Sequence, residues 1–220
     1  MLRYFLIRIA PILLLVVLGY SFFMPSAGER QFLQTEAALN KAQSVRMELT
    51  AHDKATSSYN LLEVACPDRQ HTIEKTTFLD PPPNSQPYPE TERITIGAAE
   101  YLKSPSTGAW AALPGISGRR AIGCAGAPSP VEAAPWPAFK VIRALAHIEK
   151  GEMDEVSGEP CRQWKVTFHQ PNGTEKIFDY CINPDDNLPR RMRTAESSMQ
   201  MVLTNWNKPL PIEPPAELRQ

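Results

Sequence analysis

A segment bounded by two cysteines, CRQWKVTFHQPNGTEKIFDYC (161–181), most constrains how this chain can fold. Its apolar residues alternate with polar ones on both sides of the centre: Trp164, Val166 and Phe168 before it, and Phe178, Tyr180 and Ile182 after it. A period of two is typical of strands with one apolar face. Pro171-Asn172-Gly173 supplies turn chemistry, because proline presets φ and Asn-Gly tolerates positive φ. The segment therefore predicts a β-hairpin.

The register of this hairpin follows from its apolar face. A shared apolar face requires even-numbered residues opposite even-numbered residues. A loop of 170–172 with Gly173 as a bulge residue meets this condition and places Trp164 opposite Phe178. It also places Cys161 directly opposite Cys181, close to disulfide range. We therefore predict two disulfides: Cys161–Cys181 from the register, and Cys66–Cys124 by elimination. The alternative, four free thiols, is disfavoured in an oxidising compartment.

Residues 1–28 read as a targeting segment. Arg3 and Arg8 precede the apolar run Ile9–Met24, and Ser26-Ala27-Gly28 offers small residues for cleavage after Gly28. If it is not cleaved, the stretch 4–24 is just long enough to anchor the protein in the membrane. Signal peptide and signal anchor both remain open. Either one places residues 29–220 outside the cytoplasm, in the periplasm or at the outer face of the cytoplasmic membrane.

The composition suits one mainly β domain over residues 29–215, followed by a short tail, 216–220. The chain of 220 residues is 42% apolar, which is enough for a core, and has 22 prolines against 11 glycines. So many prolines argue against a mostly helical protein. A net charge of −1 without a large basic patch argues against a nucleic-acid partner.

The remaining pattern predicts an α+β protein with an antiparallel sheet covered by helices. Apolar residues at helical spacing predict helices over 29–43 and 138–150. Alternation and turn residues predict further strands at 44–53, 59–66, 69–77, 92–98, 99–103, 110–113, 153–158, 188–194 and 198–205. Successive strands with little helix between them favour an antiparallel meander.

The apolar faces of these strands give a set of candidate ligand-binding residues. Its members are Met47, Leu49, Leu62, Val64, Ile94, Ile96, Trp164, Val166, Phe178, Tyr180, Met199, Met201 and Leu203. Such a set forms either a packed core, the default interpretation, or the lining of a cavity. Methionines 192, 199 and 201 gather in the last strands, and methionine suits adaptable apolar binding surfaces.

The order of several motifs resembles the LolA-like superfamily of periplasmic lipoprotein carriers and lipid-binding lipoproteins. The motifs are ACPDRQHTI (65–73), ITIGAAEYLK and GAWAALP within 94–114, and LTNWNKPLPIEPP (203–215). The resemblance implies a curved antiparallel half-barrel with helices plugging its open face and a cavity for acyl chains. The four cysteines and the proline-rich stretches 80–90 and 125–137 depart from the family pattern, and its cavity arginine has no clear counterpart here.

No catalytic motif is present, so we expect a non-enzymatic protein without cofactor or metal. The four histidines, His52, His71, His147 and His169, lie in different elements without ligand spacing. The basic run Arg190, Arg191 and Arg193 either faces anionic headgroups or a partner, or is the polar outer face of a sheet.

Two functions are compatible with these features. In the first, the domain binds a lipid, an acyl chain or another hydrophobic ligand in a half-barrel cavity, with 138–150 as a lid; Val166→Lys or Met201→Lys should then remove ligand before the fold is lost. In the second, the core is filled and the domain is a membrane-tethered structural or partner-binding envelope protein. The sequence names no protein partner.

Overall fold

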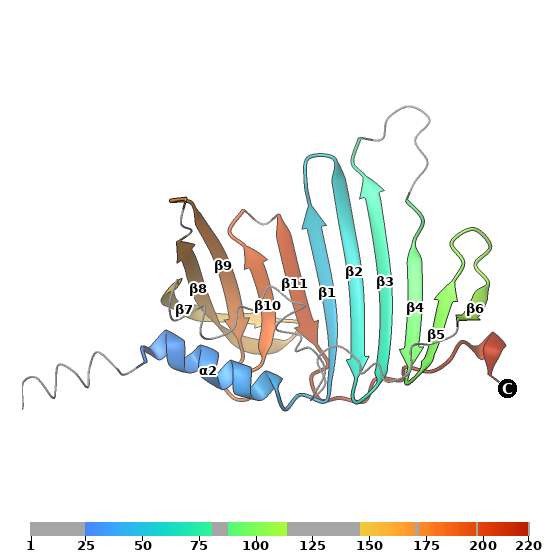
Figure 1. Cartoon of the computed structure of the whole chain (residues 1–220). Coiled ribbons are helices and arrows are strands. Elements are labelled where there is room, and N and C mark those ends of the chain that lie inside the picture. Colours follow the sequence, from blue (N-terminus) through green and yellow to red (C-terminus); the bar gives the residue numbers. More distant parts are fainter. Residues whose placement is uncertain (1–24, 81–87, 114–145, 170–171, 197, 220) are drawn as a thin grey trace, which may run out of the picture.

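The computed structural model describes residues 25–80, 88–113, 146–169, 172–196 and 198–219. These residues form an 11-stranded antiparallel sheet, one α-helix and a short 3₁₀-helix (Figure 1). The elements are α2 (Ala27–Leu39), β1 (Ser44–His52), β2 (Thr56–Ala65), β3 (Arg69–Phe78), β4 (Thr91–Ile96), β5 (Ala99–Lys103), β6 (Trp110–Leu113), β7 (Ala146–Val156), β8 (Glu159–His169), β9 (Glu175–Ile182), β10 (Pro189–Thr194), β11 (Met199–Thr204) and η1 (Ala216–Leu218).

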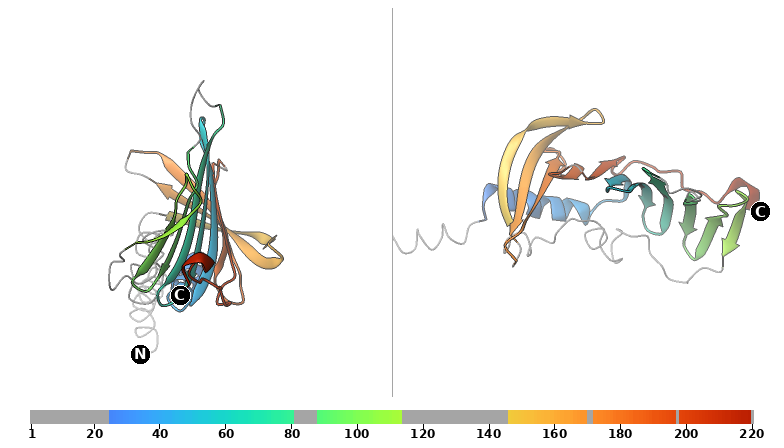
Figure 2. Two further views of the ribbon diagram at one scale, coloured as in Figure 1. Left: turned by 90° about the vertical axis from the view of Figure 1, so that its right-hand side faces the viewer. Right: turned by 90° about the horizontal axis from the view of Figure 1, so that it is seen from above.

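The sheet consists of two meanders joined at one seam. Its order is β6-β5-β4-β3-β2-β1-β11-β10-β9-β8-β7, so β1 pairs with β11 and the edges are β6 and β7. At the seam Met47 lies opposite Leu203, and Leu49 lies opposite Met201. The sheet curves most strongly at β7–β9 and does not close (Figure 2). This is the open antiparallel half-barrel predicted from the sequence.

The main core lies between α2 and one face of the strands β7–β11, β1 and β2. Residues paired across neighbouring strands point to the same face, so the register places the apolar residues of these strands together. The buried members are Phe32, Leu39, Val45, Val64, Trp164, Val166, Tyr180, Ile182, Leu188, Met192, Met201 and Leu203. We call this side of the sheet the helix face.

Helix α2 is positioned by its first turn and by an apolar stripe. Ser26 caps the helix in a capping box with Glu29, in which each side chain accepts a hydrogen bond from the other residue's backbone N–H. Phe32 packs edge-on against Tyr180, with ring centroids 5.3 Å apart. Gly28 is buried against Ile148, where a Cβ atom would lie 2.5 Å from Ile148 Cγ2. The helix thus begins before the predicted residue 29, and it ends at Leu39 instead of continuing to residue 43.

The segment after β11 runs back along the sheet on the face opposite to α2 and ends beside β6 (Figure 2). Trp206 Nε1 donates to the Pro189 carbonyl (2.7 Å), and Asn207 Oδ1 accepts from the Gln43 backbone N–H (2.8 Å). Asn207 has a φ of +56°, a left-handed conformation that asparagine tolerates better than most residues. Further along, Arg69 donates to the carbonyl of the buried Ile212. These contacts explain the Trp-Asn sequence near the C-terminus.

The predicted Cys161–Cys181 disulfide is present, but the predicted register is wrong by two residues. Trp164 lies opposite Tyr180, not Phe178, and Cys181 lies opposite Gln163. The disulfide therefore joins diagonal neighbours, whose Cα atoms are 5.3 Å apart. The loop is longer than predicted because the strands end at the His169–Glu175 pair. The other predicted bridge, Cys66–Cys124, includes Cys124, which lies outside the described residues.

The predicted helix 138–150 is wrong in its second half. Ala146–Lys150 belongs to β7, where Ile148 lies opposite Val166 on β8. A bulge between Lys150 and Met153 breaks the alternation of β7, which hides the strand pattern in the sequence. Residues 138–145 lie outside the described residues, so α2 is the one α-helix described.

Candidate functional site

The predicted ligand-binding residues gather on the helix face, with two exceptions. Those that belong to or pack against the main core are Met47, Leu49, Leu62, Val64, Trp164, Val166, Phe178, Tyr180, Met199, Met201 and Leu203. One row of paired residues crosses the half-barrel from β8 to β1: Trp164, Tyr180, Met192, Met201 and Leu49. We call the apolar side chains of this face the apolar wall.

Ile94 and Ile96 were expected in this set, but the structure places them on the opposite face. Ile94 pairs with His71 and Tyr101, whereas Leu62 pairs with Thr72, which pairs with Arg93. Arg93, not Ile94, therefore faces the same side as Leu62. The apolar wall ends at β2 because Gln70, Thr72 and Glu74 follow it on β3.

The structure adds residues to the main core that the sequence-based set omitted. They are Phe32, Val45, Ile148, Phe168, Ile182, Leu188, Met192 and Trp206. Phe168 and Ile182 continue the alternation of Trp164 and Tyr180, so the same pattern could have identified them. Phe32 and Leu188 lie on a helix and at a turn, where strand alternation gives no signal.

The exposure of the wall changes along the strands. Near α2 the side chains are buried, as Val45, Ile182 and Leu203 show. Toward the other end of the strands, away from Ser44 of β1, the apolar side chains of the wall are only partly buried. They are Met47, Leu49, Phe168, Phe178 and Met199. Phe168 and Phe178 contact each other edge-on at 5.8 Å. The part of the wall beyond α2 is thus a largely apolar surface that water reaches in part, interrupted by Thr194 between Phe178 and Met199.

Two polar atoms are buried in this core without a hydrogen-bond partner. They are Thr35 Oγ1 on α2 and Trp164 Nε1 on β8, and their residues are 0% and 4% exposed. Tyr180 lies between them in the fold, since it pairs with Trp164 and packs against Phe32, one helical turn before Thr35. Burial raises the pKa of the Tyr180 phenol, which keeps it neutral.

The opposite face of β1–β5 carries a chain of alternating charges. Glu63 lies 3.0 Å from both Arg46 and His71, and Glu92 lies 3.1 Å from His71 and 2.7 Å from Lys103. Burial opposes the charge of Glu92, but hydrogen bonds from Lys103 and His71 outweigh it and lower the Glu92 pKa. His71 thus lies between the carboxylates of Glu63 and Glu92, with one ring nitrogen within hydrogen-bond distance of each. In the described part of the chain no group of histidine, cysteine and acidic side chains is arranged to hold a metal ion.

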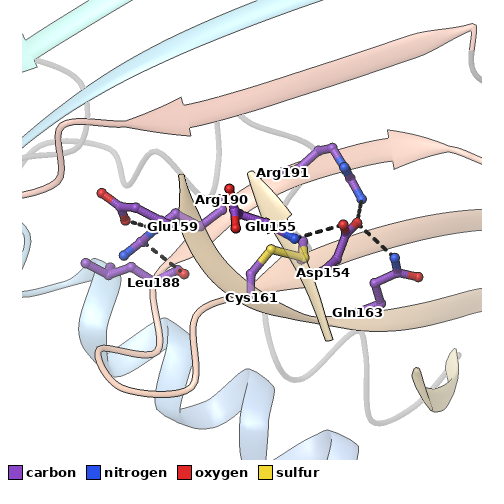
Figure 3. The surroundings of a disulfide bond; sticks show 9 residues. Asp154, Glu155, Glu159, Cys161, Gln163, Leu188, Arg190 and Arg191 are labelled. Carbon is purple, nitrogen blue, oxygen red and sulfur yellow. Dashed lines mark hydrogen bonds and ion pairs between the residues drawn. A yellow bond between two sulfur atoms is a disulfide. The ribbon is translucent and has the colours of Figure 1, made fainter. Parts of the chain in front are cut away.

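The basic run on β10 is neutralised by acidic partners. Arg191 donates to Asp154, which also accepts from Gln163 beside the Cys161–Cys181 disulfide (Figure 3). The Arg191 hydrogen bond, the Glu155 backbone N–H and Gln163 lower the Asp154 pKa to about 2.

The other two arginines of this run are paired as well. The buried Arg190 pairs with Glu159 and Asp186, and Arg193 pairs with Asp179. The run is thus engaged within the sheet, as expected of a polar outer face.

A separate pocket of about 360 Å³ lies between α2 and the turn before β10. It is lined by Gln34, Ala37, Ala38, Lys41, Asp186, Asn187, Leu188 and Asn207. None of the predicted ligand-binding residues lines it. Its mixed polar and apolar lining gives no continuous surface for an acyl chain.

Comparison with solved structures supports the fold. Over 87% of this chain and 99% of the other, the structure is similar to LprF from Mycobacterium bovis, with a TM-score of 0.53 and 14% identity. The Mycobacterium tuberculosis lipoprotein LppX matches over 85% of this chain and 98% of its own, with a TM-score of 0.51 and 14% identity. The chain thus has the LolA-like fold that the sequence predicted.

Sequence comparisons add no relative. No protein-family model and no curated protein sequence matches the chain. Among the described residues, no helix is long and apolar enough to span a membrane.

Proposed function

We propose that this domain binds a lipid or acyl chain on the part of the apolar wall beyond α2. The observation that carries this proposal is the partial exposure of Met47, Leu49, Phe178 and Met199 on the inner side of a curved sheet. Partly exposed apolar side chains that lie together on one face can be covered by an apolar ligand, and apolar surface of this kind marks binding sites.

The chemistry of the wall suits an acyl chain. Burial of each methylene group contributes about 0.8 kcal/mol, so affinity grows with chain length without polar contacts. Met47, Met192, Met199 and Met201 line a single face, and methionine side chains adapt to different chain shapes. The domain thus acts as a binding module and not as an enzyme.

We also propose that the domain works outside the cytoplasm, at or near the outer face of the cytoplasmic membrane. The apolar run Ile9–Met24 behind Arg3 and Arg8 supports export. The Cys161–Cys181 disulfide supports an oxidising compartment. The fold shared with the lipoprotein LppX is consistent with this location.

Native mass spectrometry of residues 25–220, purified from an exporting host, tests the proposal. Bound mass that leaves on denaturation and is identified as lipid supports it. Absence of bound lipid, also after incubation with phosphatidylglycerol vesicles, refutes it and favours the partner-binding envelope protein with a filled core.

The variants must spare the fold. Val166 and Met201 are 0% and 4% exposed, so lysine there is expected to unfold the protein, and these positions do not separate ligand from fold. The partly exposed Leu49 is better, and Leu49→Gln should lower lipid occupancy. Ile73→Gln is the matched control, since Ile73 is a partly exposed aliphatic residue on the opposite face. Equal loss of lipid in both variants would contradict the assignment of the wall.

A further inference from the structure

We infer that the ligand reaches from the partly exposed part of the apolar wall into the core beside α2, and that Trp164 Nε1 and Thr35 Oγ1 donate there to a hydrogen-bond acceptor at the end of its acyl chain. This inference rests on the proposed function and specifies its ligand class. The acceptor is the carbonyl oxygen of an ester, as in a diacyl lipid.

The first step is the location of the two donors. Thr35 belongs to the stripe of α2 that faces the core, with Phe32 and Leu39. Trp164 belongs to the row of the apolar wall that continues through Tyr180 and Met192. The Phe32–Tyr180 contact at 5.3 Å brings this part of α2 onto that row. One donor therefore lies on each of the two surfaces that enclose the core: Thr35 on α2 and Trp164 on the sheet.

The second step is that neither donor is satisfied within the protein. Thr35 Oγ1 and Trp164 Nε1 have no hydrogen-bond partner, although their residues are 0% and 4% exposed. Buried polar groups are nearly always paired, because an unpaired donor loses its hydration and gains nothing. By contrast, the indole of Trp206 donates to the Pro189 carbonyl at 2.7 Å. An unpaired indole is thus not a general property of this chain.

The third step is the type of group that would satisfy them. An indole N–H is a donor only, so its partner must be an acceptor, and a hydroxyl can donate to the same kind of group. A carboxylate is disfavoured, because neither basic residue beside Trp164 on this face is buried with it: Lys150, which pairs with Trp164, is exposed, and the partly buried Arg162 already donates to the Gly151 carbonyl. A neutral carbonyl is the acceptor that fits an otherwise apolar surface.

The experiment compares two lipids that differ in this group alone. Dissociation constants of residues 25–220 are measured for a diacylglycerol, the diester, and for the dialkylglycerol with the same chains, the diether, because neither lipid carries a charge. The wild type should prefer the diester. Trp164→Phe and Thr35→Val should each reduce the preference about threefold to tenfold, the value of one hydrogen bond.

Matched controls exist for both changes. Trp206→Phe removes an indole that is paired within the protein, and Thr50→Val removes a hydroxyl near the Gln200 carbonyl on the other face. Both should leave the diester-to-diether ratio unchanged. Equal binding of the two lipids by the wild type, or an unchanged ratio in both core variants, overturns the inference and leaves the proposed function intact. Binding of neither lipid refutes the proposed function itself.

A second readout needs no ligand. Because the Thr35 hydroxyl is buried and unpaired, Thr35→Val should leave the melting temperature of the lipid-free protein unchanged or raise it. A fall of several degrees would show that the hydroxyl already has a partner, such as an ordered water, and would overturn its assignment as a ligand donor.

Discussion

Removal of residues 25–28 should destabilise the domain, because the turn that starts α2 lies within the segment predicted for cleavage. Cleavage after Gly28 would leave Glu29 as the first residue. The helix would then lose the Ser26 cap and the hydrogen bond from the Arg30 backbone N–H to the Ser26 carbonyl (2.9 Å). It would also lose the close packing of Gly28 against Ile148.

The magnitude follows from these contacts. Loss of the cap costs about 1 kcal/mol, and loss of the backbone hydrogen bond costs about 1 kcal/mol. A positively charged amino group at the helix N-terminus adds about 0.5 kcal/mol. The free energy of unfolding should thus fall by about 2.5 kcal/mol, which lowers the melting temperature by about 5–10 °C for a domain of this size.

Urea denaturation followed by far-UV circular dichroism compares the proteins 25–220 and 29–220. Ser26→Ala in 25–220 should account for about 1 kcal/mol of the difference, and Ser26→Thr, which keeps the hydroxyl, for little of it. Equal stability of 25–220 and 29–220 would refute the reasoning, since the first turn of α2 would then contribute nothing. A confirmed loss would argue against cleavage after Gly28, and it is compatible both with cleavage before Ser26 and with a signal anchor.

Three further predictions concern the outer face. The pKa of Asp154 is lowered to about 2, so its carboxylate stabilises the fold above its ordinary pKa, and this contribution is lost as the pH falls from about 4 towards 2. Asp154→Asn should therefore lower the free energy of unfolding at neutral pH and reduce its dependence on pH between about 4 and 2. Arg190→Ala should cost about 2 kcal/mol in urea denaturation, because it removes a 4% exposed side chain and its charge-assisted hydrogen bonds to Glu159 and Asp186, whose side chains are 37% and 41% exposed and stay hydrated; a cost below about 1 kcal/mol would contradict this. Replacing both Cys161 and Cys181 by alanine should cost about 3 kcal/mol for a loop with a sequence separation of 20, whereas reductant without denaturant should leave the buried disulfide intact by mass spectrometry.

Strands with regular alternation could be predicted from the sequence almost to the residue. The segments 99–103 and 110–113 have the predicted bounds, and the clear alternation of 44–53 gave β1 within one residue. In these segments a period of two and flanking turn residues point to the same element. The local pattern is sufficient in a strand without a bulge, because every second side chain then points to the same face.

The hairpin register shows what alternation leaves undetermined. A shift by two residues keeps every side chain on its face, so Trp164 can oppose Phe178 or Tyr180 with the same apolar pattern. The Cys161–Cys181 disulfide does not distinguish the two registers either, because it forms between diagonal neighbours. Loop length decides the register, and Asn172 caps the longer loop by accepting from Thr174.

The candidate site was harder to predict than the strands, because it depends on which face each strand presents. Ile94 and Ile96 alternate as clearly as Met47 and Leu49, yet they lie on the other face. Only the pairing of β2, β3 and β4 fixes this, and no residue of β4 encodes it alone. In β7, Ile148 fits both the apolar stripe of the predicted helix and the alternation with Ala146, and only its pairing with Val166 on β8 identifies the strand.

Because β1 pairs with β11 at the seam, the two halves of the sheet can join only late in the synthesis of the chain. Arg46 pairs with Thr204, so the sheet stays in two halves until almost the whole of the described chain has been synthesised. Until then β1 has one unpaired edge, and α2, the first of the described elements, has no partner until β7–β10 have been synthesised. Such non-local pairing is slow and leaves an edge open to other chains. A protein with this topology needs protection of the β1 edge until β11 has paired with it.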